Sequence, residues 1–222
     1  MPIYVELVGN RLYNEDMKTD RRKIFRILIF FTALSAVLFP LFVWFRGANL
    51  AGNPAVLLEI FPAFGLLAFA TMWLHIVGAP FRTRLEKYFD FGKFVSISSK
   101  VVLVSLILHP LLAFVALRLA DSPIGVLELA GPGNSYLIWI AILAWVIFIG
   151  YDIAKPFKNR DFFVRHWSVV RLASTLAFFL VLVHSLGLGR DLQIGPLRYV
   201  WIFYGLTAAA ATVLTYFFKK EI

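Results

Sequence analysis

Two histidines inside apolar segments are the residues of this 222-residue sequence whose types and spacing could best support chemistry. His109 follows the run Val-Leu-Val-Ser-Leu-Ile-Leu, and His184 follows Ala-Phe-Phe-Leu-Val-Leu-Val. An ionisable side chain in a lipid-spanning segment is costly, so it is a functional candidate. Two neutral imidazoles on neighbouring helices suit the two axial positions of one haem iron, and helix bundles hold such cofactors in their cores. The alternative is a pair of structural histidines, each bonded to a serine or a backbone carbonyl.

Other metal chemistries fit this sequence less well. A zinc site needs three or four ligands, and the remaining histidines, His75 and His166, lie towards the other side of the membrane. The sequence has no cysteine, which excludes disulfides, thiolate-ligated metals, iron–sulfur clusters and cysteine nucleophiles. We therefore keep two hypotheses, a two-histidine haem site and two structural histidines.

The elements that position these histidines are predicted to be transmembrane helices. The chain is 60% hydrophobic and 16% charged, against about 45–50% and about 25% in soluble domains. A helix that crosses the bilayer needs about 20 apolar residues. Six stretches qualify, and they predict an all-α, six-helix membrane bundle that forms one domain over residues 1–222: 24–45, 55–79, 98–117, 136–153, 167–187 and 199–218.

The distribution of basic residues predicts the orientation of these spans. All but four of the 22 Lys and Arg residues fall on one side of the predicted membrane, and the exceptions are Arg46, Arg118, Arg190 and Arg198. Because cytoplasmic loops are enriched in basic residues, we expect both termini to lie in the cytoplasm. We expect the protein to reside in the cytoplasmic (inner) membrane. The basic charge therefore reflects topology, and we expect no nucleic-acid partner. The first span is too long for a signal peptide, so we expect a retained helix after a cytoplasmic segment of residues 1–23. The first twenty residues form either a plain tail or a segment that lies on the inner membrane surface.

This topology places His109 and His184 in the outer half of the membrane, on two helices that run in the same direction. Few other ionisable groups lie in or near the spans. Glu59 is expected near the outer end of the second span. Four other ionisable residues are expected near the inner ends of the spans: His75, Lys100, His166 and Arg171.

Residues 165–184, RHWSVVRLASTLAFFLVLVH, resemble the fifth helix of the ferric reductase-like transmembrane domain superfamily. The family pattern is a Trp, then His-Arg-Leu, then a second histidine about thirteen residues further on; its third helix carries the matching histidine, as His109 does here. The superfamily includes NADPH oxidases, ferric reductases, STEAP-type metalloreductases and the bacterial MsrQ (YedZ) membrane subunits. The length and six-helix plan are most similar to MsrQ.

The resemblance implies one outer b-type haem held by His109 and His184, and electron transfer across the membrane. The sequence departs from the two-haem members because Arg171 stands where they carry an inner histidine. A second carrier, such as FMN, FAD or a quinone, is then expected on the cytoplasmic side near Arg171, His75, His166 and Lys100, with Arg171 facing the bundle. The donor would be a cytoplasmic flavin reductase or a quinol, and the acceptor a ferric chelate, oxygen or a periplasmic reductase.

Two further expectations concern the remaining polar residues, and a rival function stands beside them. The outer arginines would bind haem propionates or the acceptor, or simply anchor the interface: Arg118, Arg190 and Arg198. His75 and His166 would be bonded structural residues or, in a quinol-linked dihaem cytochrome, a second haem pair. The rival from another class is a small six-helix transporter or membrane assembly factor in which all the histidines are structural.

Overall fold

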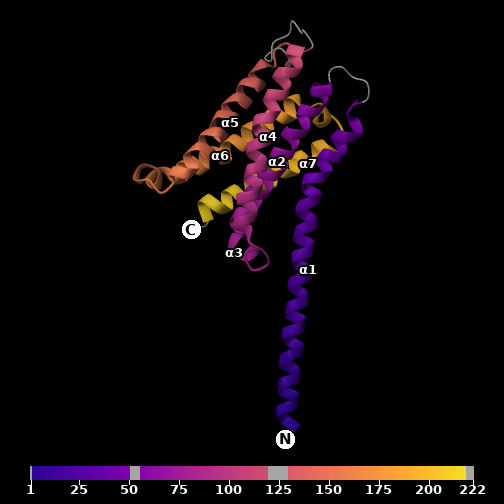
Figure 1. The fold of residues 1–222 in the computed structure, drawn as a ribbon, viewed down its shortest axis with the longest axis vertical. Coiled ribbons are helices and arrows are strands. Elements are labelled where there is room, and N and C mark those ends of the chain that lie inside the picture. The colour runs from indigo at the N-terminus through magenta and orange to yellow at the C-terminus, as the bar shows by residue number, and fades with distance from the viewer. Residues whose placement is uncertain (1, 51–55, 120–129, 219–222) are drawn as a thin grey trace.

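A computed structural model describes residues 2–50, 56–119 and 130–218 (Figure 1). The contacts and exposure of side chains are described from residue 21 onward. The described residues form helices and turns without a β-strand, and six helices are long and apolar enough to cross a membrane. The prediction of an all-α, six-span, multi-pass membrane protein is confirmed. The long helices are α1 (Pro2–Gly47), α2 (Val56–Gly78), α4 (Phe91–Leu119), α5 (Ser135–Ala154), α6 (Asp161–Leu188) and α7 (Pro196–Val213).

Short helical turns connect or extend these spans. They are η1 (Ala79–Phe81), α3 (Arg82–Leu85), η3 (Lys155–Phe157), η4 (Arg190–Leu192) and the π-helical turn η5 (Leu214–Phe218). We call the side of the bundle with α3, η3 and the end of α7 the basic side, and the side with η4 the opposite side. Both ends of the described chain lie on the basic side, as an even number of spans requires (Figure 1).

Helix α1 is much longer than the predicted first span. It runs without interruption for 46 residues, which is about 70 Å at 1.5 Å per residue. Residues 2–20 therefore continue the transmembrane helix away from the other helices (Figure 1), so this part of the predicted tail is helical, and its position in the cytoplasm stays a prediction. Between Pro2 and Pro40 the sequence has no proline that would interrupt the helix.

Two closely packed helix pairs, α2 with α4 and α5 with α6, make up most of the bundle, and α1 and α7 pack against α2. A stack of aromatic rings fills the core where α2, α6 and α7 meet. Phe69 lies between Phe178 and Trp201, with ring centroids 4.4 and 4.6 Å apart. One turn further along α2, Trp73 stacks on Tyr204 at 4.2 Å. This stack fixes how the two helix pairs are placed relative to each other.

A proline inside a helix creates a hydrogen bond between helices. A proline has no N–H, so the carbonyl four residues earlier loses its helical partner. The Tyr204 hydroxyl donates to the carbonyl of Ala36 at 2.8 Å, four residues before Pro40, so α7 satisfies the break in α1. In a bilayer no water can do this in the hydrocarbon region, so such bonds hold helices together.

Two tryptophans also form hydrogen bonds within the bundle. Trp201 is fully buried and donates to the Ser185 hydroxyl at 2.9 Å, and Trp73 donates to the Thr207 hydroxyl at 2.8 Å. Trp139, by contrast, is 57% exposed, as a lipid-facing residue would be.

Candidate functional site

The imidazole of His109 lies between α4 and α2. Its Nδ1 is 2.8 Å from the carbonyl oxygen of Phe61. The centroid of the imidazole ring is 5.1 Å from the centroid of the Phe61 phenyl ring. Gly65 makes room for the ring, because a Cβ at that position would lie 2.9 Å from His109 Cε1 and 3.0 Å from Nδ1. One turn of α2 thus supplies both the hydrogen-bond acceptor and the space that this imidazole needs.

The imidazole of His184 has the equivalent arrangement in the other helix pair. Its Nδ1 is 3.0 Å from the carbonyl oxygen of Leu137 in the first turn of α5. Leu137 itself packs closely on Gly187, where a Cβ would lie only 2.5 Å from a methyl carbon of the leucine. The next residue, Ser185, accepts the bond from Trp201, so the backbone around His184 is fixed on two sides.

These bonds determine the tautomer of both rings. A backbone carbonyl only accepts, so Nδ1 must carry the proton in His109 and in His184. In the neutral imidazole Nε2 then keeps its lone pair, which is the arrangement that metal-ligating histidines adopt. The structure therefore holds both imidazoles in the same tautomer, with a lone pair on Nε2.

The donor set fits a haem better than a bare metal ion. Among the residues that the structure describes, no group of three or more His, Cys, Asp or Glu side chains could hold a metal ion. A porphyrin iron needs only two protein ligands, since the macrocycle supplies the other four. His109 and His184 would be those ligands.

The two remaining histidines are held separately. The Ser98 hydroxyl donates to the Phe94 carbonyl at 2.6 Å, so its only proton is used, and His75 Nε2, 2.7 Å away, must donate to the Ser98 oxygen. His166 is exposed; its Nδ1 bonds to the Phe162 carbonyl of its own helix at 2.8 Å. Each therefore has the partner that a structural histidine would have, His75 between α2 and α4 and His166 on the surface of α6.

Two cations expected near the basic side, Lys100 and Arg171, are both exposed. Arg171 interacts electrostatically with Tyr151 of α5, and its backbone carbonyl accepts a bond from Thr175 at 3.0 Å. Its side chain thus lies exposed beside α5, and the expectation that it faces the bundle interior stays a prediction.

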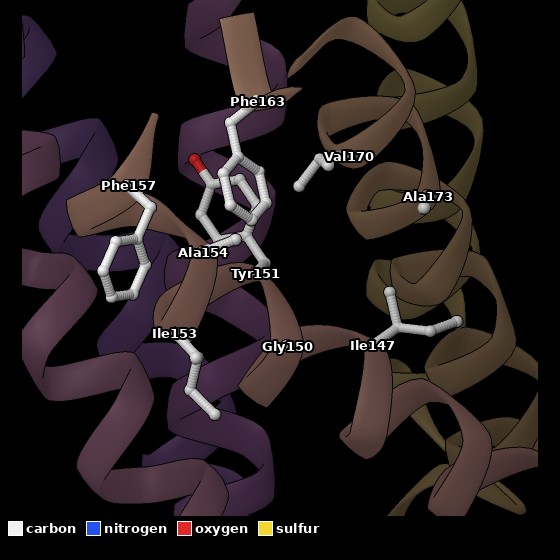
Figure 2. A pocket seen from close by; sticks show the side chains of 9 residues that line it. All are labelled: Ile147, Gly150, Tyr151, Ile153, Ala154, Phe157, Phe163, Val170 and Ala173. Atoms are coloured by element: carbon white, nitrogen blue, oxygen red, sulfur yellow. The ribbon is translucent and has the colours of Figure 1, made fainter. Parts of the chain in front are cut away.

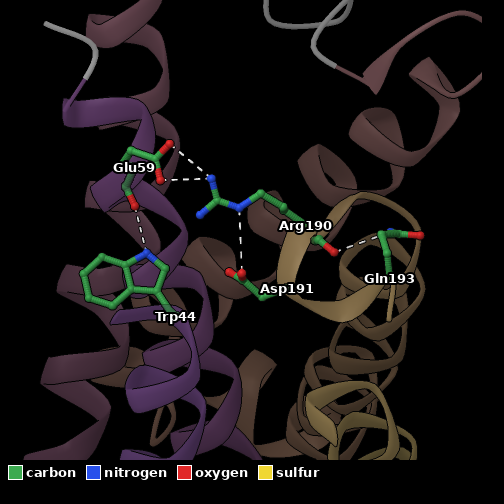
Figure 3. A network of polar contacts seen from close by, with 6 residues as sticks. Trp44, Glu59, Arg190, Asp191 and Gln193 are labelled. Atoms are coloured by element: carbon green, nitrogen blue, oxygen red, sulfur yellow. Dashed lines mark hydrogen bonds and ion pairs between the residues drawn. The ribbon is translucent and has the colours of Figure 1, made fainter. Parts of the chain in front are cut away.

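On the opposite side, Arg190 joins α2 to η4 (Figure 3). It forms an ion pair with Glu59 at 2.9 Å and lies 3.7 Å from Asp191. The Trp44 indole donates to the Glu59 carbonyl at 2.8 Å, which ties in the end of α1. Burial is the main cause of a raised pKa at the Asp191 carboxyl.

The other two arginines of this side make weaker contacts. Arg198 donates to the Leu192 carbonyl at 3.1 Å, and the Arg118 guanidinium lies 5.2 Å from the centre of the Phe114 ring. Neither is bound to a carboxylate in the described part of the chain, whereas Arg190 is. Arg118 and Arg198 are therefore the better candidates for an anionic group on this side.

Comparisons with protein-family models, with curated proteins and with solved structures find no match for this chain.

Proposed function

We propose that this chain is the membrane subunit of an oxidoreductase, in which His109 and His184 hold one b-type haem for electron transfer across the cytoplasmic membrane. The observation that carries the proposal is that the two imidazoles have the same tautomer. In each, Nδ1 donates to a backbone carbonyl, and the lone pair of Nε2 is available. The family resemblance of residues 165–184 points the same way.

The protein's own contribution would be ligand orientation and insulation. A hydrogen bond from Nδ1 to a carbonyl fixes the ring plane and increases the basicity of Nε2. When bound, the haem supplies one-electron redox chemistry. Apolar and aromatic side chains such as Phe61 would keep its surroundings dry, and low solvent exposure is one of the factors that set a haem potential.

The electron donor would act from the basic side. Arg171 lies thirteen residues before His184, which is about 20 Å along α6, so a haem at His184 leaves a large part of the membrane to be crossed. The donor is a cytoplasmic flavin, a flavoprotein or a quinol, and the basic side would attract its phosphate or acidic groups. The acceptor on the opposite side is a ferric chelate, oxygen or a periplasmic reductase, near Arg118 and Arg198.

The rival is a small six-helix transporter or assembly factor in which the histidines are structural. It accounts equally well for the two bonds from Nδ1 to carbonyls, but it assigns no role to the Nε2 lone pairs. The presence or absence of a redox-active haem therefore separates the two functions.

The experiment is a measurement of haem per chain in the detergent-purified protein and in three single variants. Under the proposal the wild type carries about one haem, and His109→Ala and His184→Ala lose it. His75→Ala is the matched control, because His75 is also a bonded histidine of the same bundle, and it retains the haem. A folded, helical and colourless wild type would overturn the proposal in favour of the rival.

A further inference from the structure

A groove opens between α5 and α6 towards the basic side (Figure 2). Its volume is about 610 Å³, within the range of about 300–1,000 Å³ typical of ligand sites. Tyr151 supplies the only side-chain hydroxyl among the residues that line it: Ile147, Gly150, Tyr151, Ile153, Ala154, Phe157, Phe163, Val170 and Ala173. The groove therefore suits an apolar molecule.

Gly150, which lines the groove, has no packing partner within the described chain that would explain a glycine there. A glycine inside a helix costs about 1 kcal/mol relative to alanine, so it usually has a packing reason. Such reasons exist at Gly65, Gly187 and Gly205, where a Cβ would lie within 3 Å of His109, Leu137 and Leu182. At Gly150 a Cβ would meet no atom within 4 Å. No part of the described chain uses the space beside Gly150.

Several cations lie close in sequence to the residues that line the basic-side end of the groove, Phe157 and Phe163. The turn that follows Phe157 carries Lys158 and Arg160, both exposed, and neither forms an ion pair within the part of the chain described here. Arg165 follows on the first turns of α6. Two acidic residues lie nearby, Asp152 on α5 and Asp161 at the start of α6, so cations outnumber anions at this end.

We propose that this groove is a binding site for an anionic phospholipid, with an acyl chain beside Gly150 and the phosphate next to Lys158 and Arg160. An acyl chain fits apolar walls that open to the bilayer, and clusters of Lys and Arg at the ends of membrane helices attract anionic lipid headgroups. The charge at the mouth of the groove selects an anionic lipid over a zwitterionic one. The inference does not depend on a haem.

The test measures binding of phosphatidylglycerol and of phosphatidylcholine with the same acyl chains to the delipidated full chain by native mass spectrometry. Two variants fill the groove, Gly150→Leu and Ala173→Leu, and one double variant, Lys158→Gln with Arg160→Gln, removes the cations. The matched control is Arg84→Gln with Lys87→Gln, which removes two exposed cations from the same side at a turn without this groove.

The wild type is expected to bind one phosphatidylglycerol about tenfold more tightly than phosphatidylcholine, and the Lys158/Arg160 variant to lose that preference. The groove-filling variants lose both lipids, and the Arg84/Lys87 control behaves as the wild type. Thermal unfolding without lipid checks that the variants are folded. Equal binding of the two lipids by the wild type would overturn the proposal. So would unchanged binding by folded groove-filling variants, or recovery of a quinone from the groove.

Discussion

The indole Nε1 of Trp145 donates to the carbonyl oxygen of Leu106 at 2.9 Å, and this bond joins α5 to α4. Leu106 is four residues before Pro110, so the proline leaves this helical carbonyl without its N–H partner, and the tryptophan of the neighbouring helix provides a replacement. Because Pro110 is exposed, it can be replaced without disturbing a packed core.

The Trp145 bond predicts a coupling that a double-mutant cycle can measure. Trp145→Phe in the wild type is expected to cost about 1 kcal/mol, within the range of hydrogen bonds between membrane helices. In the Pro110→Ala background the cost is smaller, because the backbone N–H of the introduced alanine satisfies the Leu106 carbonyl. Denaturation of the four proteins in mixed detergent micelles gives the coupling energy. Equal costs of Trp145→Phe in both backgrounds would contradict this explanation.

The contact between Gly65 and His109 predicts that Gly65 cannot be enlarged without cost. In Gly65→Ala the new methyl group would lie 2.9 Å from the imidazole, so the ring must shift, and overpacking of this kind costs about 1–3 kcal/mol. Gly150→Ala is the matched control in a helix interior, since nothing lies within 4 Å of its Cβ. We expect Gly65→Ala to have lower thermal stability and weaker haem retention than the wild type, and Gly150→Ala to have neither. The idea fails if both alanine variants behave alike.

The partly buried carboxyl of Asp191 predicts a pH-dependent difference between Asp191→Asn and the wild type. Burial raises the pKa of Asp191 above its ordinary value of 3.8, so the folded protein binds this proton more readily than the unfolded chain. The carboxyl therefore costs stability above the raised pKa, and this cost disappears as the pH falls towards 3.8.

The Asn variant has no such titration. We expect its melting temperature relative to the wild type to be highest near neutral pH and to decline as the pH is lowered through the window between the two pKa values. Parallel melting curves at several pH values measure this trend. A relative stability of the variant that increases on acidification would show that the ion pair with Arg190, and not burial, dominates at Asp191.

The sequence alone was sufficient for the six spans, because apolar run length is a strong constraint. From the cost of polar groups in lipid, the sequence also made His109 and His184 candidates, whose role stays a prediction. It did not indicate the partners of these histidines. The acceptors are the backbone carbonyls of Phe61 and Leu137, and a carbonyl has no residue-type signature. The only sequence signal was the presence of Gly65 in the second apolar span.

Other features depended on rotation and space, which apolar patterns do not specify. Arg171 is exposed because of the side of α6 on which it lies, and the open space at Gly150 depends on how α5 and α6 separate towards the basic side. The helical conformation of residues 2–20 was not predicted, because their polar composition indicates a tail outside the bundle and neither favours nor prevents a helix.

The most direct test of the central proposal is low-temperature electron paramagnetic resonance of the oxidised, detergent-purified protein. If His109 and His184 ligate one iron through Nε2, the wild type shows a single low-spin ferric haem with two imidazole ligands. His184→Ala then gives a high-spin signal or no haem, and His75→Ala leaves the wild-type signal unchanged. A wild type with no ferric haem signal, or a low-spin signal that survives loss of either His109 or His184, would contradict the account.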